Sequence, residues 1–92
     1  MEDAKFRKNL LGEVVGPNEV FLKRQQVQEK CAMSRSNIYK LMGEGKFPLP
    51  QKVSHRCTVW LASDIDIWRS MTTESFFARY GKQILEAKEQ AA

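Results

Sequence analysis

The chain is most informative at residues 33–45, which read MSRSNIYKLMGEG. Ser34 is a good helix N-cap, because its hydroxyl can accept a hydrogen bond from a free backbone N–H in the first turn. A helix is therefore predicted over residues 35–42. It should end at the glycines that follow, since glycine adopts the left-handed conformation common at helix C-termini. Pro48 and Pro50 prevent the helix from continuing.

This predicted helix has an apolar side and a polar side. At about 100° per residue, Leu41 and Met42 fall within about 60° of Ile38 and form the buried sector. The other side chains offer hydroxyl, amide, phenol and cationic groups that can bind base edges and phosphates. These candidate DNA-binding residues are Arg35, Ser36, Asn37, Tyr39 and Lys40. Any surface helix has a polar side, but that alternative does not explain why the outer side of this helix has no acidic residue before Glu44.

The residues before this helix predict another helix and an N-terminal arm. Residues 23–32 contain no glycine or proline and place apolar residues on one narrow stripe, as expected for a helix that rests on a core. Residues 20–22 form a short apolar anchor. Residues 1–19 are predicted to be a loose arm or a weak helix, interrupted at Gly16-Pro17.

The residues after Pro50 change to a strand pattern. Residues 51–54 and 57–61 are rich in β-branched and aromatic residues, so they predict a hairpin with a two-residue turn between them. A basic hairpin tip can lie along a DNA groove or a phosphate strand. Lys52, His55 and Arg56 are therefore further candidate DNA-binding residues, and a solvated turn is the alternative.

Two more helices complete the predicted fold. One opens at Ser63, where Ser63 and Asp66 fit the capping-box pattern, and the other covers residues 73–92. The fold class is small α+β: a winged helix-turn-helix with two helices, a two-stranded β-hairpin wing, a third helix and an additional C-terminal helix. The expected division is an arm at 1–19, a DNA-binding domain at 20–71, and a helix at 72–92 that packs on the domain or mediates self-association.

The aromatic residues divide into an expected core and one open patch. The expected core residues are Phe21, Phe47, Trp60 and Trp68. Phe76, Phe77 and Tyr80 form an apolar patch on the last helix, which either packs back onto the core or holds a second subunit. In the rival hypothesis of a protein-interaction adaptor, this C-terminal aromatic face is the working surface.

Positive charge is concentrated in the middle of the chain. Residues 23–56 contain eight basic and two acidic residues, a net charge of +6, whereas residues 1–22 and 57–92 are each −1. A phosphate backbone is attracted to such a segment and releases its counterions on binding. This segregation favours double-stranded DNA as the partner over the adaptor hypothesis, and a strong salt dependence of binding would decide between them.

The sequence disfavours several other classes of protein. No run approaches the ~20 apolar residues of a membrane helix, and the start of the chain has no apolar signal region, so we expect a cytoplasmic, nucleoid-associated protein without a membrane partner. Cys31 and Cys57 are expected to be reduced and partly buried, and with the single histidine they have no recognised metal spacing. Asp64 and Asp66 are better explained by helix capping than by catalysis. No cofactor, metal or enzymatic activity is expected.

Residues 20–70 resemble the AlpA family of small phage and mobile-element regulators, which are related to excisionases. The resemblance rests on Met33–Met42, on Gly45–Pro48 and on the spacing of Trp60 and Trp68; it also includes Phe21-Leu22, Val27, Lys52 and Arg56. It implies a winged-helix fold like the head of MerR proteins. It further implies sequence-specific DNA binding, with the helix at 35–42 in the major groove and the hairpin at 51–61 along the adjacent groove or backbone.

Such a resemblance implies one of two roles. One is transcriptional regulation of an integrase or other element genes, and the other is that of a recombination directionality factor that bends attachment-site DNA during excision. A second copy of the chain and an integrase are further candidate partners. The chain departs from the family at Ala32, where glycine is usual, and at Arg24 and Gln28, where leucine is usual. The first helix is therefore expected to be less tightly buried, and its turn slightly different.

Overall fold

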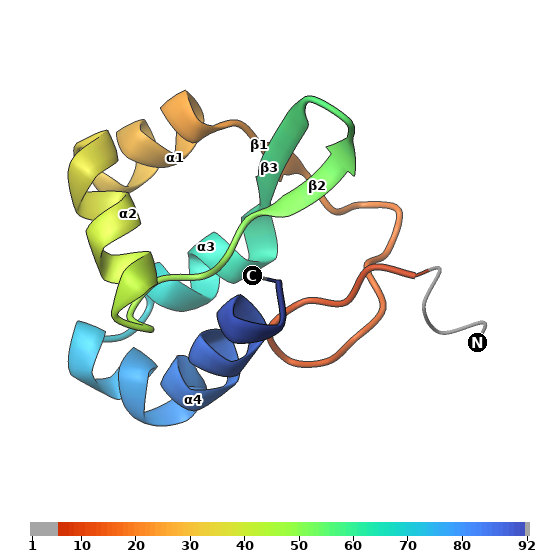
Figure 1. Cartoon of the computed structure of the whole chain (residues 1–92). Coiled ribbons are helices and arrows are strands. Elements are labelled where there is room, and N and C mark those ends of the chain that lie inside the picture. The colour runs from red at the N-terminus through yellow and green to blue at the C-terminus, as the bar shows by residue number, and fades with distance from the viewer. Residues whose placement is uncertain (1–5, 92) are drawn as a thin grey trace.

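The computed structural model describes residues 6–91, in which four helices and three strands form one small α+β fold (Figure 1). In chain order the elements are β1 (Phe21–Leu22), α1 (Arg24–Cys31), α2 (Arg35–Gly43), β2 (Gln51–Ser54), β3 (Cys57–Leu61), α3 (Ala62–Arg69) and α4 (Thr73–Ala91). The predicted winged helix-turn-helix arrangement is confirmed: α1 and α2 are the helix pair, and β2 and β3 are the wing. Among the described residues, no helix is long and apolar enough to cross a membrane.

The turn between α1 and α2 depends on a left-handed residue. Ala32 has φ of 54°, and the Met33 N–H donates to the Gln28 carbonyl over 3.1 Å, which closes the end of α1. The chain then enters α2 at Ser34, whose hydroxyl accepts a hydrogen bond from the Asn37 N–H at 3.2 Å, as predicted. Ala32 thus occupies a conformation that glycine adopts at lower cost.

The wing is part of a three-stranded antiparallel sheet rather than an isolated two-stranded hairpin. Central β3 lies between β1 and β2, with Phe21 opposite Leu61. The apolar anchor of the sequence is therefore a strand. Because side chains alternate along a strand, Leu22 is 3% exposed and Phe21 is 43% exposed. The expectation that Phe21 belongs to the core is wrong.

Two tryptophans connect the core to the loop that follows α2. The Trp60 indole N–H donates to the Pro48 carbonyl at 3.0 Å, and the Trp68 indole N–H donates to the Lys46 carbonyl at 2.9 Å. Phe47, which lies between these two carbonyls, is fully buried and meets the Trp68 ring edge-on at 4.9 Å. These contacts fix the loop and hence the C-terminal end of α2.

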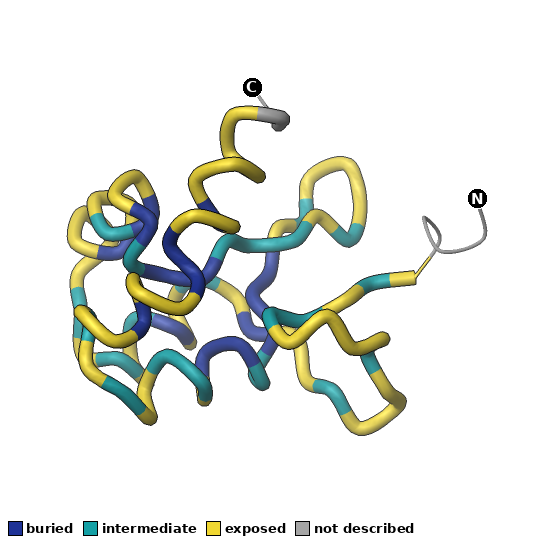
Figure 2. The backbone as a smooth tube through the Cα atoms, turned by 90° about the horizontal axis from the view of Figure 1, so that it is seen from below, coloured by how far each residue is buried: buried dark blue, intermediate teal, exposed yellow. Residues whose placement is uncertain are grey.

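Helix α4 packs back onto the molecule along one side. Phe76, Tyr80 and Ile84 are buried, with Leu10, Leu49, Ile67, Trp68 and Met71 packed against them. Figure 2 shows this division along the helix, whose turns alternate between buried and exposed. Gly45 allows a close approach, because a Cβ there would lie 2.9 Å from the Leu85 Cγ atom and 3.0 Å from the Gly81 carbonyl. The turn that follows α2 therefore rests on α4.

The N-terminal segment is docked, and within residues 6–19 it forms no helix. Lys8 pairs with Val14 in an antiparallel bridge, and the Leu10 N–H donates to the buried Asp64 carboxylate at 2.9 Å. The prediction of a loose arm or a weak helix is thus wrong for residues 6–19. Its partners are far away along the chain, so local pattern could not reveal them.

The start of α3 differs from the predicted capping box. The helix begins at Ala62, and Glu19 caps it by accepting hydrogen bonds from the Ser63 N–H at 3.0 Å and from the Ser63 hydroxyl at 2.7 Å. Asp66 instead lies 3.9 Å from Arg69 on the surface. Asp64 holds the N-terminal segment. Asp64 and Asp66, which the sequence predicted to cap this helix, therefore have other partners.

Candidate nucleic-acid interface

Helix α2 turns its polar side chains to solvent. Ile38 and Met42 are buried at 0% and 7% exposure and attach the helix to the core. The candidates predicted on this helix all lie exposed; they are Arg35, Ser36, Asn37, Tyr39 and Lys40. The helix is thereby oriented with its hydrogen-bonding groups outward, where a nucleic acid can reach them.

Two of these exposed side chains support one another. The Arg35 guanidinium lies over the Tyr39 ring, 5.7 Å from its centroid, one helical turn away. This contact turns Arg35 along the outer side of α2, although its helical angle lies nearer the apolar sector. A planar guanidinium held in this way can make the paired hydrogen bonds that recognise a guanine edge or a phosphate.

The cations of this surface are free of acidic partners within the described residues. Glu44, the first acidic residue after Glu29, lies at the C-terminal end of α2, and its carboxylate is 3.7 Å from the Lys46 ammonium. In residues 6–91, no ion pair involves the basic candidates Arg35, Lys40, Lys52 or Arg56. Their charge is therefore available to an anionic partner.

The wing presents a second exposed basic group. β2 and β3 are joined by the predicted two-residue turn at His55-Arg56, and Lys52, His55 and Arg56 are all exposed. The register shifts between Lys52 and Ser54, a β-bulge that bends and twists the strand. Figure 1 shows α2 on one side of the molecule and this hairpin on the other. The candidates on α2 and those on the wing are therefore two separate groups of exposed residues.

Sequence reasoning missed the residues that brace the wing. The Arg7 guanidinium donates to the Lys52 carbonyl at 3.0 Å, and the Gln51 amide donates to the Lys8 carbonyl at 3.0 Å. These bonds bring two basic residues of the N-terminal segment to the hairpin. Counting charge by position along the chain separated them from the basic middle segment, so no local signal could have revealed the arrangement.

The groups that serve other chemistries are absent or engaged in the part of the chain described. No cluster of histidine, cysteine and acidic residues suited to a metal lies within residues 6–91. Cys31 and Cys57 are free thiols of intermediate exposure, and burial raises the pKa of Cys31, which disfavours its reactive thiolate. Burial also raises the pKa of Asp64 to about 6, although its hydrogen bond from Leu10 opposes this shift.

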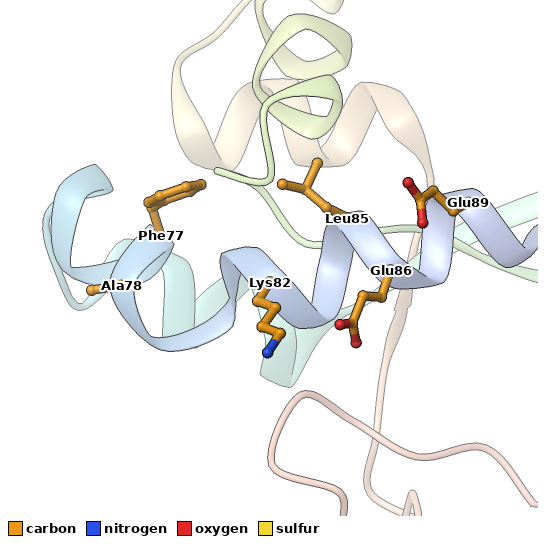
Figure 3. Close-up of a pocket in the computed structure, with 6 residues that line it drawn as sticks. All are labelled: Phe77, Ala78, Lys82, Leu85, Glu86 and Glu89. Carbon is orange, nitrogen blue, oxygen red and sulfur yellow. The ribbon is translucent and has the colours of Figure 1, made fainter.

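The outer surface of α4 is smaller than the predicted aromatic face. Phe76 and Tyr80 point into the core, whereas Phe77 and Leu85 are 42% and 36% exposed. These two line a shallow depression of about 400 Å³, together with Ala78, Lys82, Glu86 and Glu89 (Figure 3). The Lys46 ammonium lies 5.9 Å from the Phe77 ring centroid. Two of the three aromatic residues of the predicted patch, Phe76 and Tyr80, are thus part of the core.

Comparison with known proteins gives a family. The family described as prophage CP4-57 regulatory protein (AlpA) matches residues 20–73, which include both helices of the helix-turn-helix and the wing. An uncharacterized protein, ORF88, of Enterobacteria phage P4 is 36% identical over 50 residues, or 54% of this chain and 57% of that protein. The chain therefore spans little more than half the length of that relative.

No solved structure matches the chain. The family description is regulatory rather than enzymatic, in agreement with the sequence prediction of a protein that is not an enzyme. The match covers more than half of the chain and includes α1, α2, α3 and all three strands of the sheet. The chain belongs to the AlpA family of phage regulatory proteins.

Proposed function

We propose that this chain is a sequence-specific DNA-binding protein of a phage or mobile element, which inserts α2 into the major groove. One observation carries the proposal: the outer side of a capped, core-anchored helix bears hydroxyl, amide, phenol, ammonium and guanidinium groups, and no residue of the helix carries a carboxylate. A major groove displays acceptors, donors and thymine methyl groups in a pattern that such side chains can read.

The candidate side chains divide by the contacts they can make. Asn37 carries an amide that can pair with an adenine edge, and Arg35 carries a guanidinium suited to guanine or phosphate. Lys40 is a flexible point charge suited to phosphate. Ser36 and Tyr39 can add single hydrogen bonds to either. In the proposed complex, Lys52, His55 and Arg56 of the wing lie along the adjacent groove or backbone and fix the register of α2.

Two roles of such a protein require the same surface. A transcriptional regulator of integrase or other element genes needs specific binding at a promoter. A recombination directionality factor needs binding at an attachment site and a bend in that DNA. We propose that the chain serves in one or both roles, with an integrase as a partner in the second. A measured bend in attachment-site DNA when the chain binds would favour the second role.

A protein-interaction adaptor is the rival function, and the exposed Phe77 and Leu85 are the observation in its favour. This surface is narrow, because Phe76, Tyr80 and Ile84 are buried against the molecule. A stable protein interface usually buries about 800 Å² on each partner, which is far larger than two side chains provide. The DNA-binding proposal uses more of the exposed polar surface and its charge.

A gel-shift titration tests the proposal. Duplexes from the element's own attachment site and integrase promoter are titrated with the full chain, in the presence of random-sequence competitor, at low and moderate salt. Retention of one duplex over competitor, with affinity that falls steeply with salt, is expected. A folded chain with no preference and no retention at low salt would instead favour the adaptor.

A further inference from the structure

We infer that the N-terminal segment Phe6–Val15 is a third DNA-contacting element, with Lys8 as a phosphate contact beside the wing. The inference rests on the proposed function and extends it to residues outside the part of the chain that matches the family, which begins at residue 20. Three observations support it: the attachment of the segment to the wing, its internal order and its charge.

The segment is attached directly to the wing. Gln51 donates its side-chain amide to the Lys8 carbonyl, and Arg7 donates to the Lys52 carbonyl, each over 3.0 Å. Since β2 is an edge strand of the sheet, its outer side is open to such partners. The segment thus lies against the strand that carries Lys52, one of the candidate contacts.

The backbone of the segment is ordered by its own hydrogen bonds. The Val15 N–H donates to the Arg7 carbonyl at 2.9 Å, and Lys8 pairs with Val14. The Leu10 N–H then ties the segment to Asp64 of α3 at 2.9 Å. A cation on backbone that is already fixed loses less conformational entropy on binding than one on a free tail.

The charge of Lys8 is available at this position. Its side chain is exposed, and in residues 6–91 it forms no ion pair. Arg7 is partly engaged, since its guanidinium lies 5.6 Å from the Phe21 ring centroid, but it keeps its charge. With Lys52 and Arg56, the wing and its brace carry four cations. Glu13, an acid of the same segment, faces the Asn9 amide at 3.5 Å.

Arg7 is a positioning residue in this arrangement. It bonds to the backbone of Lys52 and stacks on Phe21 of β1, so one side chain connects both edge strands of the sheet. A wing held at both edges keeps its basic tip in a defined direction. Lys8, whose side chain makes no such bond, is the residue left to contact the phosphate.

The test is the salt dependence of binding of the full chain to a mixed-sequence duplex of about two helical turns, followed by fluorescence anisotropy. Each phosphate contact contributes about 0.9 to the slope of log K against log salt, measured between about 50 and 200 mM. Lys8→Ala is expected to lower the magnitude of that slope by about 0.9, and Lys8→Arg is expected to restore it.

Lys82→Ala is the matched control, because it removes the same charge from an exposed lysine of α4 that points away from the end of α2 (Figure 3). If the wild-type chain binds DNA and Lys8→Ala has the same slope as Lys82→Ala, this inference is overturned and the proposed function stands. Absence of salt-dependent binding by the wild-type chain would overturn both. A lower slope in Lys8→Ala alone supports the inference.

Discussion

Lys40 and Asn37 are both exposed on α2, but they differ in what they can offer DNA. Lys40→Ala is expected to weaken binding to all sequences and to lower the salt slope by about 1, because an ammonium contacts phosphate. Asn37→Ala is expected to relax preference at particular bases, at about 1–3 kcal/mol of discrimination, because an amide reads a base edge. Competition titrations against single-base variants of the site measure both effects.

The comparison needs a control for charge and one for folding. Lys82→Ala matches the charge change of Lys40→Ala on a different surface, and its slope should equal that of wild type. Circular dichroism melts confirm that each variant is folded. If both α2 variants bind like wild type, α2 is not the reading helix.

Asp64 gives the stability of the molecule a defined pH dependence. Burial raises its pKa from 3.8 to about 6, so the folded state holds this proton more tightly than the unfolded state. The contribution of Asp64 to the free energy of unfolding is therefore largest below about pH 4 and is lost as the pH rises through about 6. Asp64→Asn is expected to remove that slope and to raise stability at pH 7 by roughly 2 kcal/mol.

Urea unfolding at several pH values between those limits measures this effect. The asparagine keeps an oxygen to accept the hydrogen bond from Leu10, so the N-terminal segment should stay docked. Asp66→Asn is the control, since Asp66 is exposed and should leave the slope unchanged. A wild-type stability that does not fall between about pH 4 and 6 would contradict the assignment.

The turn of the helix-turn-helix contains the clearest backbone cost in the fold. Ala32 has φ of 54°, a conformation that costs an alanine about 1 kcal/mol more than a glycine. Ala32→Gly is therefore expected to stabilise the protein by about 0.5–1 kcal/mol, partly offset by the greater freedom of glycine in the unfolded chain. Thermal or urea unfolding measures it, and a loss of stability would mean that the turn differs from the one described.

The contact between α4 and the turn that follows α2 is tested by two glycines close in sequence. Gly45 has φ of 75° and lies against Leu85 and the Gly81 carbonyl, whereas Gly43 is helical and has nothing within 4 Å of the place where a Cβ would lie. Gly45→Ala is expected to cost about 2 kcal/mol or more, from strain and from a displaced α4. Gly43→Ala is expected to stabilise by up to about 1 kcal/mol.

Urea unfolding of both variants measures this contrast. Because each variant adds one methyl group, the difference between them isolates the effect of backbone conformation and close packing. Equal stabilities would show that α4 does not rest against Gly45 as described.

Local patterns predicted the elements that carry their own signals. Ser34 caps α2, the glycines end it, and the strands at 51–54 and 57–61 occur as predicted, because each depends on residues within a few positions. Strand β1 and the cap of Ser63 by Glu19 were not predicted, since their partners are distant in sequence. For the same reason, the docking of residues 6–15 on the wing had no sequence signal.

The sequence predicted which α2 side chains are exposed more reliably than it predicted the surface as a whole. Ile38 and Met42 define the buried side by spacing alone, so the outer side follows from helical geometry. The Arg35–Tyr39 contact and the brace from Arg7 depend on side-chain directions and on chain folding. Neither contact can be predicted from the spacing of residues along the chain.

The size of the molecule limits how much DNA one copy can contact. Its longest dimension is 34 Å, which is about one helical turn of B-DNA. One short reading helix and one wing therefore contact a short site, and specific complexes of larger DNA-binding proteins bury more surface. We propose that high specificity comes from two or more copies on adjacent sites, and the mass of the specific complex in analytical ultracentrifugation tests this.

Nuclear magnetic resonance titration of the full chain with its specific duplex tests the central claim most directly. Backbone and side-chain signals of residues 35–40 and 52–56 should shift or broaden, while those of Phe77 and Leu85 on α4 should remain unchanged. This result would locate DNA on α2 and the wing. Shifts confined to the outer side of α4, with α2 unchanged, would contradict the account.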